Sequence, residues 1–381
     1  MKRIALITDG IWPYVIGGMQ KHSYYLCKYF AKSGVHVDLF HFNQSPLDIH
    51  KLEVFTEEEK KYIQPTVVEF PDTAKGPGHY IANSYLYSKS IFELIKDRLN
   101  EYDFIYTKGF TGWHLLREKK RSDLKCPPVG VKFHGYEMYQ KAPDMKAKLQ
   151  QILFLRKPVK EVSLLADIVF SYGGKITEII KSIGVPAERI TELPSGVEEA
   201  LVADLIVPCN DKRKFIFLGR YERRKGIEEL SEALKQLTDK SNFEFHFIAP
   251  IPEAKQIKHP AIKYHGELRD KQMISSIMRE CDVLVCPSWS EGMPNVILEA
   301  MSNGLTVLAT DVGATSVIVN ERTGWLMQSS SPEEIRNYLE KIIKAAPSEI
   351  DAKKQAALDL IRGRFTWEKL IKELIGKLER R

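Results

Sequence analysis

The sequence has no long apolar run and no recognisable export signal. No stretch approaches the roughly 18 consecutive apolar residues that are needed to cross a bilayer. Lys2 and Arg3 stand in front of an apolar segment, but Ile4–Ile7 is too short for the core of a signal peptide. The sequence therefore predicts a protein that stays in the cytoplasm.

Cysteine is also scarce. The five cysteines are scattered, with no Cys-x-x-Cys pair and no companion histidines at zinc-finger spacing. Cys281 and Cys286 flank an apolar stretch, where a free thiol behaves as a small core side chain. We therefore expect reduced, structural thiols and no metal site built on them.

Two short motifs are missing as well. The chain contains no Asp-x-Asp pair, the usual means by which transferases hold a diphosphate through a divalent cation. The loop from Gly10 to Gly18 has no Gly-x-Gly-x-x-Gly spacing, which disfavours a nicotinamide-dependent dehydrogenase. We expect neither a metal nor a cofactor, and nothing in the sequence indicates a nucleic-acid partner.

What is present is a pattern that occurs twice. The strand Lys2–Leu6 leads through a glycine-containing loop into a helix over Gln20–Ser33, and the strand Lys214–Leu218 leads through a charged loop into a helix over Ile227–Leu237. A chain of 381 residues also exceeds what one hydrophobic core usually supports. The sequence predicts an α/β protein of two facing, doubly wound, Rossmann-like domains, with a ligand cleft at the carboxyl ends of their strands.

The turn-rich stretch Leu193-Pro194-Ser195-Gly196 separates the two units. We place the first domain at residues 1–195 and the second at 196–364. Residues 1–195 contain 28 Lys and Arg against 22 Asp and Glu, whereas residues 196–381 contain 28 of each. The whole net charge of +6 therefore belongs to the first domain, which suggests an anionic partner for it.

A basic loop, Gly219–Gly226, follows a predicted strand and precedes a predicted helix. A turn would bring Arg220 and Lys225 to one diphosphate, where arginine offers paired donors and lysine a mobile charge. Their task in transfer chemistry would be to neutralise a departing nucleoside diphosphate. A solvated basic loop is the alternative, and this segment alone leaves both open.

The segment after the apolar strand Cys281–Cys286 carries two carboxylates at a helix start. Pro294 suits the first helical position, so the amides of Asn295 and Val296 would point out of a helix N-terminus, which is a ready anion site. Glu291 precedes this helix and Glu299 lies within it. The two acids would bracket one pocket, and each could accept two hydroxyl hydrogen bonds, although either one alone could be an exposed acid favoured by the helix dipole.

In this context the string from Glu291 to Glu299 resembles the Glu-x7-Glu signature of the family 4 retaining glycosyltransferases with the GT-B fold. The resemblance covers essentially the whole chain and includes Gly17-Gly18, His134-Gly135 and the tail Phe365-Thr366-Trp367. It implies metal-independent transfer of a sugar from a nucleotide-diphosphate donor to a saccharide or lipid-linked acceptor, in cell-envelope polysaccharide or glycolipid synthesis. It also implies that the first domain binds the acceptor and the second the nucleotide-sugar donor, and that a final helix, residues 365–381, crosses back to the first domain.

The resemblance assigns roles to individual residues. Arg220 and Lys225 would hold the donor diphosphate, Glu299 the ribose, and Glu291 the transferred sugar. His134 would lie beside the sugar; the alternative is a buried histidine at a strand end. The remaining donor-site residues would be Gly17, Gly18, Gly292, Met293, Pro294, Asn295 and Val296. Val312-Gly313-Ala314-Thr315 departs from the family's pattern close to the cleft, which could alter the sugar or acceptor preference.

Two rival functions stay open. A nucleotide-sugar 2-epimerase shares the architecture and would use cleft carboxylates to move protons. A non-catalytic protein that binds a nucleotide-sugar is the other rival, although it would not need the whole set of residues. The sequence names neither the base, the sugar nor the acceptor.

A basic and apolar segment in the first domain suggests contact with an anionic membrane. Between positions 141 and 160 one acid, Asp144, faces six basic residues: Lys141, Lys146, Lys148, Arg156, Lys157 and Lys160. The apolar side of a short interfacial helix would be formed by Leu149, Ile152, Leu153, Phe154 and Leu155. The alternative is that these apolar residues pack into the core and the lysines are solvated.

Overall fold

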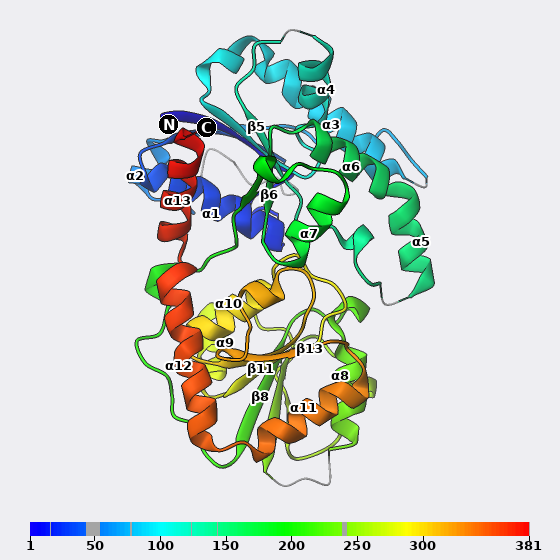
Figure 1. The fold of residues 1–381 in the computed structure, drawn as a ribbon, viewed down its shortest axis with the longest axis vertical. Helices are drawn as coiled ribbons and strands as arrows, with labels where there is room; N and C mark the ends of the chain where they lie inside the picture. Colours follow the sequence, from blue (N-terminus) through cyan, green and yellow to red (C-terminus); the bar gives the residue numbers. More distant parts are fainter. Residues whose placement is uncertain are drawn as a thin grey trace.

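A computed structural model describes residues 1–15, 17–42, 54–76, 78–122, 124–142, 144–237 and 242–380, except for the side chains of Lys146 and Ala147. Two sheets, parallel in every recorded pairing, divide the described chain into an upper and a lower half (Figure 1). This confirms the fold class that the repeated strand, loop, helix and strand pattern predicts.

The first sheet has the strand order β3-β2-β1-β4-β5-β6-β7. Its strands are β1 (Arg3–Ile7), β2 (His36–His41), β3 (Ile63–Val67), β4 (Phe104–Lys108), β5 (Val129–Lys132), β6 (Ile168–Ser171) and β7 (Ile190–Glu192). The helices of this half are α1 (Gly18–Lys32), α2 (Glu57–Lys60), α3 (His79–Ile95), α4 (Trp113–Arg121), α5 (Met145–Phe154), α6 (Arg156–Leu165) and α7 (Lys175–Ser182).

The second sheet has the order β10-β9-β8-β11-β12-β13. Its strands are β8 (Arg213–Leu218), β9 (Phe243–Ile248), β10 (Ile262–Tyr264), β11 (Val283–Cys286), β12 (Thr306–Thr310) and β13 (Gly324–Met327). Its helices are α8 (Ile227–Lys235), α9 (Lys271–Arg279), α10 (Asn295–Ser302), α11 (Pro332–Lys344) and α12 (Pro347–Arg364). The apolar segment Cys281–Cys286, which the sequence predicts as a strand, contains β11, and all four residues of β11 are buried.

The end of the chain returns to the first sheet. Helix α13 (Trp367–Glu379) packs against α1, and Trp367 stacks on Tyr25 with ring centroids 5.4 Å apart. The crossing is fixed where the amide of Val197 donates to Phe365 and the amide of Trp367 donates to Val197. As a result both chain termini lie at the same end of the molecule, and the α-amino group of Met1 pairs with Glu379 (Figure 1).

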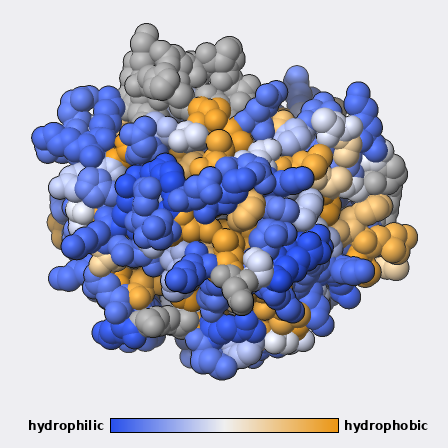
Figure 2. All heavy atoms as spheres, turned by 90° about the horizontal axis from the view of Figure 1, so that it is seen from above, coloured by the Kyte–Doolittle hydropathy of each residue, from blue (hydrophilic) through white to orange (hydrophobic). Residues whose placement is uncertain are grey.

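Helix α5 exposes its apolar side chains. Met145, Leu149 and Leu153 are 84%, 57% and 63% exposed, so these three do not pack into the core. Figure 2 shows apolar side chains gathered at the right-hand edge of the molecule, the side on which α5 lies in Figure 1. None of the helices within the described ranges is both long and apolar enough to cross a bilayer.

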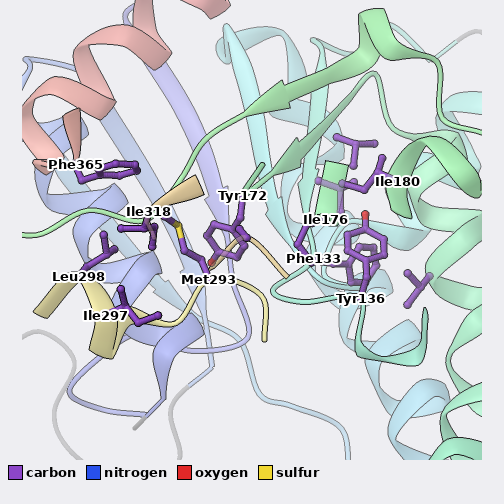
Figure 3. Close-up of a cluster of buried hydrophobic side chains, with 14 of the residues drawn as sticks. Phe133, Tyr136, Tyr172, Ile176, Ile180, Met293, Ile297, Leu298, Ile318 and Phe365 are labelled. Carbon is purple, nitrogen blue, oxygen red and sulfur yellow. The ribbon is translucent and has the colours of Figure 1, made fainter. Parts of the chain in front are cut away.

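The two halves share a continuous apolar cluster. Tyr172 of the first half lies beside Met293 of the second half, and Ile176 and Ile318 belong to the same buried cluster (Figure 3). Beside this cluster Lys175 pairs with Asp311 across the halves, with 2.9 Å between the ammonium and the carboxylate. The halves therefore touch through buried side chains at one side of the space between them.

Candidate functional site

A cleft of about 1180 Å³ lies between the halves. It is lined by the start of α1, the loop after β5, the basic loop after β8, α9 and the start of α10. Every residue that the sequence predicts for the site lines this cleft: Gly17, Gly18, His134, Arg220, Lys225, Glu291, Gly292, Met293, Pro294, Asn295, Val296 and Glu299. The position agrees with the rule that ligands bind outside the carboxyl ends of parallel strands.

Glu291 is the most tightly held of these side chains. Its carboxylate lies 2.6 Å from the ammonium of Lys225 and 3.3 Å from the guanidinium of Arg224, and it accepts a 2.8 Å hydrogen bond from Ser288. Burial would raise the pKa of Glu291, but the charges of Lys225 and Arg224 outweigh it and lower the pKa. The carboxylate is therefore ionised at neutral pH, able to accept hydrogen bonds and unsuited to carry a proton.

Arg220 stands apart from this cluster. Its side chain is 75% exposed, and its guanidinium lies 2.9 Å from the carboxylate of Glu222 in the same loop. The predicted pair of cations is thus placed at one cleft, with Lys225 at its wall and Arg220 at its mouth. Arg224, to which the sequence analysis gave no role, also lines the cleft and joins the predicted loop to the predicted carboxylate.

The helix after Glu291 begins one residue later than the sequence suggests. Pro294 has φ −73° and ψ 102° and is the N-cap, so α10 begins at Asn295. The expectation that Pro294 occupies the first helical position is wrong because its ψ is extended, which proline permits just before a helix. Asn295 and Val296, in the first turn of α10, still line the cleft, and the first N–H groups of a helix have no partner within the helix.

At two positions the backbone lies so close to a neighbouring carbonyl oxygen that only glycine fits. A Cβ at Gly292 would lie 1.6 Å from the carbonyl oxygen of His134, so only glycine lets the two halves meet here. Gly226 has φ +69°, and a Cβ there would lie 1.9 Å from the carbonyl oxygen of Pro287. These contacts hold the basic loop and the Glu291 turn in fixed relation to each other and to the first half.

His134 lies opposite α10 in the first half. Its Nδ1 is 2.7 Å from the hydroxyl of Tyr172, which orients the ring. Burial lowers the pKa of His134 well below its ordinary value, and Lys108, Lys132 and Arg224 add to the effect. A neutral imidazole at this place can donate one hydrogen bond to a bound oxygen.

Beneath His134 lies a buried polar cluster that the sequence analysis did not identify. The Lys108 ammonium is 3.0 Å from Nδ1 of His22, and both side chains are buried. Burial lowers the pKa of Lys108 to about 7, which the charge of Asp9 opposes, and burial raises the pKa of Asp9 to about 6. Lys108 ends β4, and Asp9 follows the neighbouring strand β1; that placement at one edge of the sheet was the available signal.

The comparisons with known proteins cover both halves. The Glycosyltransferase Family 4 model matches residues 16–201, and the Glycosyl transferases group 1 model matches residues 212–345. The chain is 24% identical over 353 residues to an uncharacterized glycosyltransferase of Methanocaldococcus jannaschii, covering 90% of this chain and 93% of that one. It is 25% identical over 273 residues to UDP-Gal:alpha-D-GlcNAc-diphosphoundecaprenol alpha-1,3-galactosyltransferase of Escherichia coli, covering 66% and 69%.

Solved structures share the fold. Sucrose-phosphate synthase from Thermosynechococcus elongatus superposes with a TM-score of 0.75 at 19% identity, covering 100% of this chain and 98% of that one. Anabaena HepE in complex with UDP-glucose superposes with a TM-score of 0.67 at 17% identity, covering 99% and 100%. At such identities the likeness shows the fold alone.

Proposed function

This chain belongs to glycosyltransferase family 4, and from that premise we propose that it moves a sugar from a nucleoside-diphosphate donor to an acceptor hydroxyl with retention of configuration. The observation that carries the proposal is the ionised, buried Glu291 held by Lys225 and Arg224 at the start of α10, with Glu299 farther along the same helix in one cleft. The two carboxylates accept hydrogen bonds from two sets of hydroxyls, and the cations and helix amides bind the diphosphate between them.

The chemistry follows from this arrangement. The bond between the anomeric carbon and the donor phosphate oxygen breaks while the acceptor oxygen bonds to the same face of the sugar. The acceptor proton passes to the departing phosphate oxygen. Lys225, Arg220 and the amides of α10 neutralise the charge that develops on the leaving group, and the facing halves exclude water. Glu291 and the neutral His134 position the sugar hydroxyls.

Glu291 also distinguishes this reaction from epimerisation. A 2-epimerase needs a carboxyl group that takes up and returns a proton near neutral pH. The charges of Lys225 and Arg224 lower the pKa of Glu291, which makes it a poor proton carrier and a good acceptor of hydrogen bonds. This supports transfer over the isomerase alternative.

Three finer features belong to the same proposal. Transfer proceeds without a metal, because Lys225, Arg220 and Arg224 supply positive charge to the cleft. The acceptor is a saccharide or lipid-linked envelope precursor, which the diphosphoundecaprenol acceptor in the name of the Escherichia coli relative supports. The exposed apolar side chains of α5, among basic residues, support docking of the first half on an anionic membrane.

A donor screen tests the proposed function. The protein is incubated with UDP-, GDP- and ADP-sugars without acceptor, and binding and slow release of free sugar are measured. We expect one base to be preferred and Glu299→Gln to weaken binding of that donor by about tenfold, because a charge-assisted hydrogen bond to the ribose is lost. A 2-epimerised sugar as the main product would establish the isomerase instead. If no donor binds, the proposed function is wrong.

A further inference from the structure

Glu299 already has a cationic partner, and that partner comes from the other half of the molecule. The ammonium of Lys21, in the first turn of α1, lies 3.3 Å from the Glu299 carboxylate and donates a hydrogen bond to it. Both side chains are partly exposed and both line the cleft. This is the carboxylate that the proposed function gives to the donor ribose, so ribose and Lys21 compete for it.

The pair is weak enough to be exchanged. A partly solvated ion pair contributes about 0–1 kcal/mol, because water competes for both charges. A ribose diol presents two hydroxyls to one carboxylate and arrives with the rest of the nucleotide bound. The free energy of the Lys21–Glu299 pair therefore does not prevent donor binding.

The Lys21 ammonium, once released from Glu299, can reach a diphosphate bound at the start of α10. A Cβ at Gly18, at the start of α1, would lie 3.4 Å from Nε2 of His134 and 3.6 Å from Nδ2 of Asn295. The N-terminal turns of α1 and α10 thus face each other across the cleft, and Lys21 projects from the first of them. A diphosphate held by the start of α10 comes within reach of the flexible Lys21 side chain, whose ammonium is a mobile point charge.

We propose that Lys21 exchanges partners when the donor binds: the ribose takes Glu299, and the Lys21 ammonium moves to the diphosphate. This rests on the proposed function and adds a phosphate ligand supplied by the first half. Donor binding would then draw α1 toward α10. A nucleoside without phosphate would compete with Lys21 for Glu299 and gain no contact with the lysine. A nucleoside diphosphate would gain that contact, so Lys21 would favour the diphosphate over the nucleoside.

The experiment compares these two ligand classes by calorimetry. Uridine, guanosine and adenosine and their 5′-diphosphates are titrated into the wild-type chain. The preferred base is then used for Lys21→Met, Lys21→Arg and a control, Lys32→Met, at an exposed residue in the last turn of α1. We expect Lys21→Met to weaken diphosphate binding about tenfold while nucleoside binding is unchanged or tighter. Lys21→Arg should retain most of the diphosphate affinity, and Lys32→Met should match the wild type.

The outcomes separate the two proposals. Equal weakening of nucleoside and diphosphate by Lys21→Met, or unchanged diphosphate affinity, would overturn the exchange and leave the proposed function standing. No binding of any diphosphate to the wild-type chain would overturn the proposed function and this inference with it. Thermal unfolding of each variant checks that the fold is intact.

Discussion

Single side chains at the cleft differ in how firmly they are held, and this determines what their removal does. Lys225 is fixed against Glu291, whereas Arg220 reaches the cleft from an exposed position. Both would neutralise charge on the leaving diphosphate, a contact that strengthens as the bond breaks. Their contribution should therefore appear in turnover.

We expect Lys225→Ala and Arg220→Ala each to lower turnover at least about tenfold with the fold intact, since truncating such a donor costs a few kcal/mol. Lys235→Ala, on the solvent side of the helix that follows the basic loop, is the control and should retain full turnover. Turnover close to wild type in both cleft variants would falsify the assignment of the clamp.

Lys108 gives a prediction about stability and pH. Its pKa is about 7 in the fold and 10.5 in a solvated chain, so between these values the unfolded chain binds a proton that the folded chain does not. Stability should rise with pH through this window by up to about 1.4 kcal/mol per pH unit. Lys108→Met should flatten the rise between pH 7 and 9, as measured by urea unfolding, and Lys32→Met should not.

Among the residues in and beneath the cleft, the sequence predicted those that share one short motif and missed those whose partners are distant in the sequence. Glu291, Glu299 and Lys225 stand in recognisable strings, and all three line the cleft. Lys21 is separated from Glu299 by 278 positions, and Lys108 from His22 by 86. Such contacts depend on how the halves and strands meet, which periodicity along one segment does not encode.

Among the secondary-structure elements, those with a regular apolar pattern were predicted well. The expected helix over Gln20–Ser33 is α1, and the expected strand over Lys214–Leu218 is β8, each within two residues. Helix α3 was not predicted, and its buried face includes the polar residues Asn83, Ser84 and Ser88, which weaken the apolar stripe. Burial of polar groups follows from tertiary packing, so sequence pattern alone gave no signal there.

Helix α5 gives a prediction about membranes. We expect the protein to sediment with anionic liposomes, more at low salt, because exposed leucines and nearby lysines act together. Leu149→Ser with Leu153→Ser should reduce binding without lowering thermal stability, since neither side chain is in the core. Leu205→Ser, an exposed leucine of the second half, is the control, and an absence of sedimentation even at low salt would refute docking.

The whole molecule supplies the positive field of the cleft from both halves, with Lys21 on one side and Arg220, Arg224 and Lys225 on the other. We therefore expect transfer activity to persist in excess chelator, because protein charges replace a divalent cation at the diphosphate. Activity that is lost with chelator and restored by manganese or magnesium would overturn metal independence. The assay needs the full chain, since neither half alone contains the set.

The crossing of the chain at Val197 and Thr366 bears on how such enzymes can be recombined. The upper half is assembled from two separate stretches of sequence, because α13 completes the apolar surface of α1 through Trp367, Leu370 and Ile371. A chimera cut only in the segment near Gly196 would join α1 to a foreign final helix. The first half would therefore keep its native packing only in grafts that carry residues 365–381 together with the N-terminal half, which makes two cut sites the minimum for domain exchange.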